Sequence, residues 1–373
     1  MNLKIVVDEN IPQAQRMFAD LGEVIAVPGR TMSPADISGA DVLLVRSVTA
    51  VNAQLLGESQ LKFVGSATIG TDHVDTQWLA SQGIPFASAP GCNADAVVDY
   101  DLCCLSQLLQ QTGEHLLDKT VAVVGVGNVG SRLVARLEAM GVKVLKNDPL
   151  RAEREEGFIS LTQALTQADI VCLHTPLTKE GLAPSYHLIG RAQLDLLKPG
   201  AILLNAGRGP VIAGEELKAF LQQRRDVRAV LDVWEHEPSV DLELAALVSI
   251  ATPHIAGYSL EGKLRGSFML KQAMAKQLGF TLKQQLEDFL PSPAIKGVDI
   301  DVDCDVLSLM SLQYDPYADD RRLRATLGLE TQPEAFDRLR KQYPVRREFS
   351  ALSVRVNQGA ARKDLSAAGF NLI

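Results

Sequence analysis

Short apolar runs separated by helical patterns organise the first part of the chain. Runs of strand length occupy residues 5–7, 24–27, 42–45 and 63–65, and a helical pattern covers residues 11–21. Strands that alternate with helices usually pair in parallel and are joined by crossover helices. This part of the chain therefore predicts an open, parallel α/β sheet.

A second series of apolar runs follows a long apolar stretch at residues 94–109, which predicts a helix. They predict about six parallel strands, the number found in a full doubly wound sheet. A helical pattern over residues 258–280 then predicts a helix that returns the chain to the first unit. The six runs occupy residues 121–124, 142–145, 170–173, 201–205, 227–231 and 248–251.

The pattern changes beyond about residue 281. Pro291 and Pro293 interrupt the chain, and residues 298–306 then alternate strictly between apolar and polar positions. A period of two residues predicts a half-exposed antiparallel strand. A further apolar run at residues 352–356 predicts another strand, so that the C-terminal part is expected to be a small α/β appendage.

A glycine-rich turn joins the first two strands of the second series. Gly125, Gly127 and Gly130 follow the strand in the order G-x-G-x-x-G, and Asn128 and Val129 complete the turn. The first glycine permits a tight turn, the second lets the backbone approach a pyrophosphate, and the third lets the helix pack closely on the strand. The helix N-terminus offers unpaired N–H groups and a positive dipole end to phosphates. The turn therefore predicts a dinucleotide site.

Asp148 ends the second of these strands, 18 residues beyond Gly130. A carboxylate at this place can accept hydrogen bonds from both hydroxyls of an adenine ribose, and it repels a 2′-phosphate. NAD is therefore favoured over NADP, although Lys146 and Arg151 lie close by in the sequence. Sites for S-adenosylmethionine use a similar turn and acid, so this stretch alone leaves a methyltransferase open.

Composition restricts the class of protein. A chain of 373 residues exceeds one ordinary core, so about two or three domains are expected. The apolar runs have strand length and the first residues resemble a β-strand, so neither a membrane helix nor a signal peptide is expected. A net charge of −8 argues against general nucleic-acid binding.

Cysteines and aspartates give no indication of a metal site. The five cysteines lack metal-ligand spacing and predict free thiols in a reducing cytoplasm. Asp301, Asp303 and Asp305 lack the glycine and the terminal glutamate of a calcium loop. We therefore expect no bound metal.

Three later stretches place charged or titratable side chains just after predicted strands. Arg208 follows the strand that ends at Asn205. Asp232 and Glu237 follow the next strand, and His254 follows the last one. Because open α/β sheets bind ligands at the carboxyl ends of their strands, we expect these side chains to converge. Taken singly, each is also compatible with a surface charge or a structural histidine.

Together these residues fit the oxidation of a secondary alcohol. His254 can take the hydroxyl proton while a hydride leaves for a nicotinamide. Glu237 would orient the imidazole and stabilise its protonated form. Arg208 would hold a substrate carboxylate and polarise the developing carbonyl. Asp232, at the end of its strand, would bond the nicotinamide carboxamide.

The motifs GVGNVG, NAGRG, DVWEHEP and TPHIAG, in this order, resemble the D-2-hydroxyacid dehydrogenase family. In that family the arginine, glutamate and histidine of these motifs are catalytic, which implies catalytic roles for Arg208, Glu237 and His254. The resemblance spans roughly residues 1–280 and removes the methyltransferase.

The expected fold class is α/β, with two doubly wound parallel-sheet domains and a small α/β C-terminal domain. Residues 1–95 and 257–280 would form a discontinuous, flavodoxin-like substrate domain, and residues 96–256 a Rossmann NAD-binding domain. Residues 281–373 would form a dimerisation domain. The resemblance therefore implies a cytoplasmic homodimer that uses NAD and a small-molecule substrate.

Further motifs resemble one branch of this family, whose members oxidise a phosphorylated four-carbon 2-hydroxy acid. They read VDENIP, VRSVTAVN, FVGSATIGTDHVD, APGCNADAVVDY and HIAGYSLEGK. By this resemblance Thr175 and Gly257 contact NAD. The implied substrate contacts are Ser47, Thr68 and Tyr258.

An anionic substrate requires local basic groups in an acidic protein. On its chemistry alone, Arg46 is a candidate phosphate ligand, and the alternative is a solvated loop arginine. A further hypothesis is that Arg346 or Arg347 of the C-terminal part reaches the active site of a partner subunit. The alternative for this pair is a solvated charged face.

Two other functions stay open. The first is another dehydrogenase of this family, acting on D-3-phosphoglycerate or on hydroxypyruvate and glyoxylate. The N-terminal motifs and the C-terminal part distinguish such a dehydrogenase from the branch described above. The second is a non-enzymatic NADH-sensing binding protein that retains the catalytic residues. Measurable turnover would distinguish an enzyme from such a protein.

Overall fold

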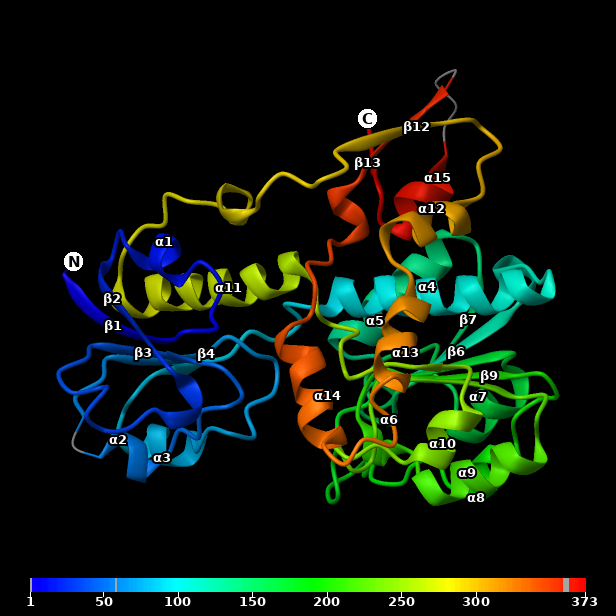
Figure 1. Cartoon of the computed structure of the whole chain (residues 1–373), viewed down its shortest axis with the longest axis horizontal. Helices are drawn as coiled ribbons and strands as arrows, with labels where there is room; N and C mark the ends of the chain where they lie inside the picture. Colours follow the sequence, from blue (N-terminus) through cyan, green and yellow to red (C-terminus); the bar gives the residue numbers. More distant parts are fainter. Residues whose placement is uncertain (1, 58, 358–361) are drawn as a thin grey trace. The chain divides into compact units, whose positions relative to one another are not determined.

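The computed structural model describes residues 2–57, 59–357 and 362–373. The chain forms two compact units, Met1–Asn93 with Ser259–Ser292 and Ala94–Tyr258 with Pro293–Ile373. Each unit has a parallel sheet of its own (Figure 1). The C-terminal part belongs to the same unit as the six-stranded sheet. The division into three domains, with boundaries near residues 95, 256 and 280, therefore stays a prediction.

The first unit is built on five parallel strands in the order β2-β1-β3-β4-β5. This is the order of flavodoxin-like folds, which confirms the predicted class. The strands are β1 (Leu3–Asp8), β2 (Gly22–Val27), β3 (Val42–Val45), β4 (Phe63–Ser66) and β5 (Phe86–Ala87). The helices are α1 (Ala14–Phe18), α2 (Ala53–Leu56), α3 (Thr76–Ser81) and α11 (Leu260–Leu278).

Helices cover both faces of this sheet, with α11 on one side and α2 and α3 on the other (Figure 1). Leu264, Phe268 and Met274 of α11 share a buried cluster with Ile5 and Leu44 of the sheet. Because a sheet buried on both faces needs apolar residues at successive positions, its central strands read as continuous apolar runs. β5 was not predicted, since its two residues are too few to show a pattern.

The second unit contains six parallel strands in the order β11-β10-β9-β8-β6-β7, as many as predicted. A Rossmann sheet has its third strand beside the strand that corresponds to β7. Here that position holds only an isolated parallel bridge, between Lys146 and Phe158. The strand order reverses between β6 and β8, and ligands of such sheets bind at this switch point. The strands are β6 (Thr120–Val124), β7 (Lys143–Asn147), β8 (Ile170–Leu173), β9 (Ile202–Asn205), β10 (Arg228–Leu231) and β11 (Ile250–Ala251).

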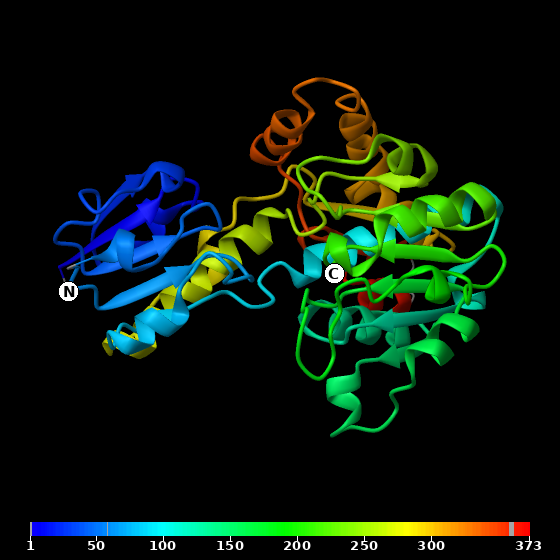
Figure 2. The same ribbon diagram turned by 90° about the horizontal axis from the view of Figure 1, so that it is seen from below.

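Helices also cover both faces of the six-stranded sheet (Figures 1 and 2). One face carries α4 (Ala94–Thr112) and α5 (Asn128–Ala139), and the other carries α8 (Arg191–Leu194), α9 (Gly214–Gln223) and α10 (Leu242–Leu247). The remaining helices are α6 (Pro149–Ala152) and α7 (Leu161–Gln167). The 3₁₀ turns of the chain are η1 (Gly29–Thr31), η2 (Leu116–Asp118), η3 (Gly209–Val211), η4 (Leu286–Phe289) and η5 (Phe349–Ala351).

The C-terminal part contains a three-stranded sheet, and here the strand prediction was wrong in two ways. The predicted strand at 298–306 is only four residues long, and it pairs in parallel. It ends early because Asp305 instead caps a helix, its side chain accepting a hydrogen bond from Ser308 N. The strands are β12 (Gly297–Ile300), β13 (Ser353–Val356) and β14 (Asn371–Leu372), and the helices are α12 (Val306–Gln313), α13 (Pro316–Arg324), α14 (Gln332–Lys341) and α15 (Lys363–Ala368).

The C-terminal part shares its core with the nucleotide-binding sheet. Leu309 and Met310 of α12 belong to the same buried cluster as Leu102 and Leu105 of α4. Burial of such side chains stabilises the fold by about 1.5–3 kcal/mol each. The C-terminal part is therefore an integral piece of the second unit and not a loosely tethered tail.

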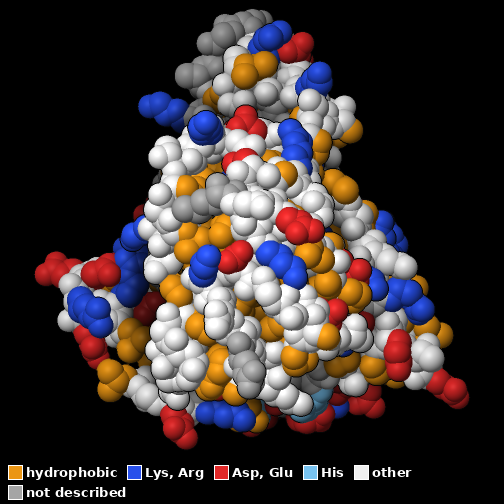
Figure 3. All heavy atoms as spheres, turned by 90° about the vertical axis from the view of Figure 1, so that its left-hand side faces the viewer, with side chains coloured by type: hydrophobic (Ala, Val, Ile, Leu, Met, Phe, Trp, Pro, Cys, Tyr) orange, Lys and Arg blue, Asp and Glu red, His pale blue; other side chains and the backbone are white. Residues whose placement is uncertain are grey.

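The surface carries charges of both signs. Lysine, arginine, aspartate and glutamate side chains are interspersed with apolar ones over the face drawn in Figure 3. This face therefore lacks the single basic surface of a nucleic-acid-binding protein. Among the described residues, no helix combines the length and apolar character that a membrane crossing requires.

Candidate active site

The glycine-rich turn has the geometry of a dinucleotide cradle. Gly125 adopts a φ of +86°, which favours glycine. A Cβ on Gly130 would lie 2.0 Å from the Gly125 carbonyl oxygen, so the close packing of α5 on the turn requires glycine there. A Cβ on Gly127 would meet no atom within 4 Å. Gly127 thus borders open space at the N-terminus of α5, where a pyrophosphate fits.

Asp148 lies beside this turn at the end of β7, as predicted. Its Oδ2 accepts a hydrogen bond of 3.0 Å from Val126 N, and its Oδ1 accepts one of 3.1 Å from Arg151 N. Arg151 donates to the Val126 carbonyl and is paired with Glu155, so its charge is already neutralised. The nearest candidate ligand for a 2′-phosphate is therefore engaged elsewhere, which fits NAD better than NADP.

Thr175 lies just beyond β8, on the other side of the switch point. Its Oγ1 is buried and has no hydrogen-bond partner among the described residues. A Cβ on Gly125 would lie 2.7 Å from Thr175 N, which places the threonine against the glycine turn. A buried hydroxyl without a partner is costly unless a ligand satisfies it, so this position fits a cofactor contact.

His254 and Glu237 form a hydrogen-bonded pair. His254 Nδ1 lies 2.7 Å from Glu237 Oε2, and Trp234 N donates to Glu237 Oε1 at 2.8 Å. Burial would raise the pKa of Glu237, but the hydrogen bond and charge of His254, the Trp234 N–H and the charge of Arg340 outweigh it and lower the pKa. Glu237 is therefore a carboxylate that can only accept hydrogen bonds.

The carboxylate at Glu237 fixes the tautomer of His254. Because Glu237 only accepts, the imidazole proton lies on Nδ1, and Nε2 presents a lone pair. His254 is held at a φ of +56°, a strained conformation for a residue other than glycine. Strain of this kind persists only where surrounding contacts impose it.

Asp232 imposes this conformation on the histidine loop. The buried carboxylate accepts hydrogen bonds from Thr252 Oγ1 and Ile255 N through Oδ1, at 2.6 and 2.8 Å, and from Ala256 N through Oδ2, at 2.9 Å. The Asp232 carbonyl also accepts from His254 N at 2.7 Å. The structure therefore gives Asp232 a role in positioning His254, which the sequence did not reveal, and its expected bond to a nicotinamide stays a prediction.

Arg208 lies at the same edge of the sheet. Asn205 of β9 pairs in register with Leu231 of β10, whose successor is Asp232. Arg208 Nη1 donates to the Gly207 carbonyl at 2.8 Å. The other guanidinium nitrogens have no hydrogen-bond partner among the described residues, so they are available to bind a carboxylate.

The candidate substrate residues of the first unit also lie at one edge. Val45 of β3 pairs with Ser66 of β4, so that Arg46, Ser47 and Thr68 follow neighbouring strand ends. Arg46 is half-buried and donates to the Asn10 carbonyl at 3.4 Å. Thr68 donates to the Gly70 carbonyl at 3.0 Å. These side chains therefore form a polar edge suited to an anion.

The C-terminal part contributes side chains to the second unit that sequence reasoning missed. The guanidinium carbon of Arg340 lies 5.8 Å from the centre of the Tyr258 ring. The Tyr343 ring meets the same tyrosine edge-on, with centres 5.7 Å apart. In the sequence, Arg340 was one member of a basic run, and nothing distinguished it from its neighbours.

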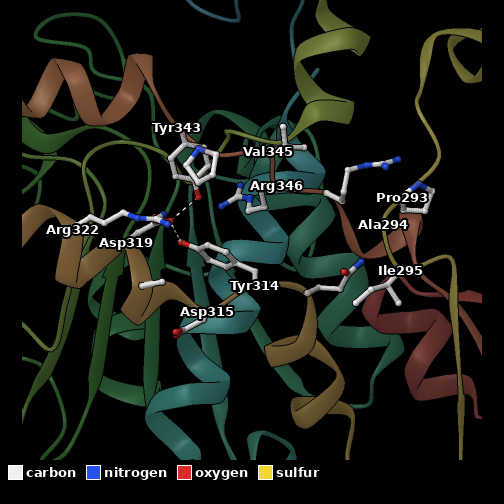
Figure 4. Close-up of a pocket in the computed structure, with 14 residues that line it drawn as sticks. Pro293, Ala294, Ile295, Tyr314, Asp315, Asp319, Arg322, Tyr343, Val345 and Arg346 are labelled. Atoms are coloured by element: carbon white, nitrogen blue, oxygen red, sulfur yellow. Dashed lines mark hydrogen bonds and ion pairs between the residues drawn. The ribbon is translucent and has the colours of Figure 1, made fainter.

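Arg346 is buried within its own chain, which contradicts the hypothesis for this residue, whereas the same hypothesis for Arg347 stays a prediction. Arg346 donates to the carbonyls of Ala96 and Ala256, the latter two residues beyond His254. Its guanidinium carbon lies 4.6 Å from the centre of the Tyr314 ring (Figure 4). A cavity of about 270 Å³ borders Arg346 in the C-terminal part, and none of the three catalytic candidates lines it.

Comparisons with known proteins agree with this geometry. Residues 104–256 match the family described as D-isomer specific 2-hydroxyacid dehydrogenase, NAD binding domain. Residues 289–369 match a family described only as a domain of unknown function. The fold resembles NAD⁺-bound 3-phosphoglycerate dehydrogenase of Entamoeba histolytica, with a TM-score of 0.61, 23% identity, and coverage of 76% of this chain and 98% of that one.

Two relatives are similar over their whole length. The erythronate-4-phosphate dehydrogenase of Proteus mirabilis (strain HI4320) is 50% identical, with 99% of each chain covered. That of Shigella flexneri serotype 5b (strain 8401) is 47% identical, with 100% of this chain and 99% of the relative covered. The similarity thus includes the C-terminal part.

The nucleotide-binding sheet and the paired histidine and glutamate at its carboxyl edge define an NAD-dependent oxidoreductase of the D-isomer-specific 2-hydroxyacid dehydrogenase class. The solved structure of that class described above covers 76% of this chain, whereas the two erythronate-4-phosphate dehydrogenases cover 99% and 100% of it. The chain belongs to the family of the erythronate-4-phosphate dehydrogenases.

Proposed function

We propose that the protein oxidises 4-phospho-D-erythronate at C2 with NAD⁺, giving (R)-3-hydroxy-2-oxo-4-phosphooxybutanoate. The observation that carries this proposal is the His254–Glu237 hydrogen bond of 2.7 Å, in a chain 50% identical to an erythronate-4-phosphate dehydrogenase over its whole length. The proposed product is a precursor in the biosynthesis of pyridoxal 5′-phosphate, and the proposed compartment is the cytoplasm.

His254 is the proposed base. Its Nε2 lone pair takes the proton of the C2 hydroxyl, and the imidazolium that forms donates from Nδ1 to the Glu237 carboxylate. Glu237 therefore stabilises positive charge on the ring as the O–H bond breaks. The strained loop held by Asp232 fixes the direction of Nε2, so that little reorganisation accompanies the transfer.

Arg208 is the proposed ligand of the substrate carboxylate. Its unoccupied guanidinium donors can form a bidentate pair with this group. The same charge stabilises the partial negative charge on the C2 oxygen as it becomes a carbonyl. Arg208 would thereby orient C2 and stabilise the transition state.

NAD⁺ supplies the acceptor for the hydride that leaves C2. The residues proposed to hold it are those of the glycine turn, Gly125, Gly127, Asn128, Val129 and Gly130, with Asp148, Thr175, Asp232 and Gly257. The open space at Gly127 and the buried Thr175 hydroxyl support this assignment. The proposed substrate contacts are Arg46, Ser47, Thr68 and Tyr258, and the polar edge at β3 and β4 supports the first three.

A homodimer formed through residues 281–373 is part of this proposal. Apolar side chains that remain exposed in the C-terminal part support it, foremost Val345 at 77% exposure. Ile295 lies in the same cavity lining as Val345, and Val302, Leu312 and Ile373 are also exposed. Exposed apolar side chains mark association surfaces where they are contiguous, and Val345 and Ile295 line one cavity.

The test is NADH formation with 4-phospho-D-erythronate and with 3-phospho-D-glycerate, measured side by side. A 2-oxo acid in the assay recycles any NADH that the enzyme retains. We expect much faster turnover of the four-carbon acid. Preference for the three-carbon acid would refute the substrate assignment and leave the catalytic roles standing. Activity on neither acid, with NAD still bound, would favour the NADH-sensing protein.

A further inference from the structure

The C-terminal part contacts the two segments that carry Glu237 and His254. Gln332, at the start of α14, accepts a hydrogen bond from Val240 N and donates to the Pro238 carbonyl, at 3.4 and 3.3 Å. Phe336, one turn later, is fully buried in the same cluster as Trp234. α14 is therefore fixed against the segment that directly follows Glu237.

Arg340 lies near the end of this helix, close to the catalytic pair. Its guanidinium carbon is 5.8 Å from the centre of the Tyr258 ring, and its charge contributes to the lowered pKa of Glu237. Tyr258 follows His254 by four residues. Arg340 thus brings a positive charge from the C-terminal part to the place where Glu237 and the histidine loop meet.

The donors of Arg340 are largely unused. Its Nε is buried and has no hydrogen-bond partner among the described residues. Its Nη1 lies 3.9 Å from Asp337 Oδ1, which is longer than a hydrogen bond. The side chain as a whole is 29% exposed, so solvent-borne ligands can reach it, and an anionic ligand at the buried Nε would satisfy a donor that is costly to leave without an acceptor.

Arg346, six residues after Arg340, has a structural role and provides a comparison for Arg340. Its Nη2 donates to two backbone carbonyls and its guanidinium stacks on Tyr314 (Figure 4). These contacts anchor the loop that carries Ala256. Arg346 Nη1 is also buried without a hydrogen-bond partner among the described residues, but Arg340 differs in that none of its nitrogens donates to a backbone carbonyl there, so anchoring of the loop does not account for it.

We propose that Arg340 binds the phosphate group of the substrate, and that the C-terminal part thereby confers selectivity for a phosphorylated acid. This inference rests on the proposed function. The substrate carries two anionic groups, and Arg208 is assigned to the carboxylate at the reacting end. A phosphate offers three acceptor oxygens, which match the planar fork of a guanidinium with free donors.

The test compares Arg340→Gln with Arg338→Gln in the full-length protein. Arg338 lies on the exposed side of the same helix turn, so its replacement removes an equal charge without touching the site. We expect Arg340→Gln to raise the KM for 4-phospho-D-erythronate roughly 10- to 100-fold, while kcat stays unchanged. Arg338→Gln should leave KM as it is.

Two further measurements separate phosphate binding from other roles. The inhibition constant of D-erythronate, which lacks the phosphate, should be the same in the wild type and in Arg340→Gln. Arg340→Lys, which keeps the charge but loses the fork, should recover part of the lost affinity. Loss of affinity for both acids, a shifted pH profile with unchanged KM, or an unaltered Arg340→Gln enzyme would each overturn the proposal.

The wild type decides the proposed function independently. If the wild-type protein does not oxidise 4-phospho-D-erythronate, the proposed function is wrong. If it does, and the variants behave otherwise than stated above, only the role of Arg340 is wrong.

Discussion

At the scale of single residues, one proton position determines how this site can work. Glu237 is held as a carboxylate by the Trp234 N–H and by His254, and it places the imidazole proton on Nδ1. The sequence indicated this pair from two motifs, but it could not reveal the backbone strain at His254 or the bonds of Asp232 that maintain it. The strain and these hydrogen bonds exist only because the folded chain places the loop of His254 against Asp232, which follows β10.

Replacing His254 by glutamine should remove the base and keep the size of the side chain. We expect kcat to fall roughly 10²- to 10⁴-fold, because an amide cannot take the hydroxyl proton. The measurement is steady-state NADH formation, with NAD binding followed by calorimetry as the control. A variant that retains near wild-type kcat would contradict the assignment of His254.

Replacing Glu237 by glutamine should change the pH dependence of turnover. The lowered pKa of Glu237 means that this group stays ionised while the pH falls through the range in which an imidazole gains its proton. Its negative charge stabilises the imidazolium, so that removing it makes protonation harder. The acidic limb of the kcat/KM profile should therefore move to lower pH. An unmoved limb would show that the pair is not coupled.

At the scale of elements, two glycines of the turn between β6 and α5 differ in their surroundings. Gly130 is required by packing, since a Cβ there would collide with the Gly125 carbonyl. Gly127 has no neighbour that excludes a side chain, which is compatible with its predicted contact with a bound ligand. The sequence motif predicted both roles, and the structure distinguishes them by what each Cβ would meet.

Alanine substitutions at these two glycines should therefore have different effects. Gly127→Ala should leave the melting temperature of the apoprotein nearly unchanged and weaken NAD binding about tenfold or more. Gly130→Ala should lower the free energy of unfolding by about 1–3 kcal/mol or more, because the turn must move. Thermal denaturation and calorimetric titration of both variants provide the check. Equal loss of stability in the two would contradict this distinction.

At the scale of the whole molecule, the C-terminal part belongs to the same compact unit as the candidate active site. It contributes Arg340 and Arg346 to the region of the catalytic loop and shares the core of the nucleotide-binding unit. The sequence predicted an appendage with a strand at 352–356, which is confirmed as β13. It did not predict the contacts with the catalytic loop, because a linear pattern does not show which elements α14 contacts.

The proposed homodimer can be tested with charges placed in exposed apolar positions. Val345→Glu should convert the dimer into a monomer, because a buried, unpaired carboxylate opposes association. Leu182→Glu is the matched control, since Leu182 is 84% exposed and lies outside the C-terminal part. Sedimentation equilibrium gives the mass of each variant. A dimer that survives Val345→Glu, or fails with Leu182→Glu, would place the interface elsewhere.

The sequence by itself determined the class of fold and indicated the candidate residues of the reaction. These conclusions came from local features, which can be recognised from a few neighbouring residues. The features are apolar runs of strand length, the spacing of three glycines and four motifs at strand ends. The tertiary structure decided the rest: that Asp232 and Arg346 hold the loop of His254, that Arg340 stands beside Tyr258, and that β12 pairs in parallel. Each of these depends on contacts between residues far apart in sequence, and such contacts are fixed only when the chain packs.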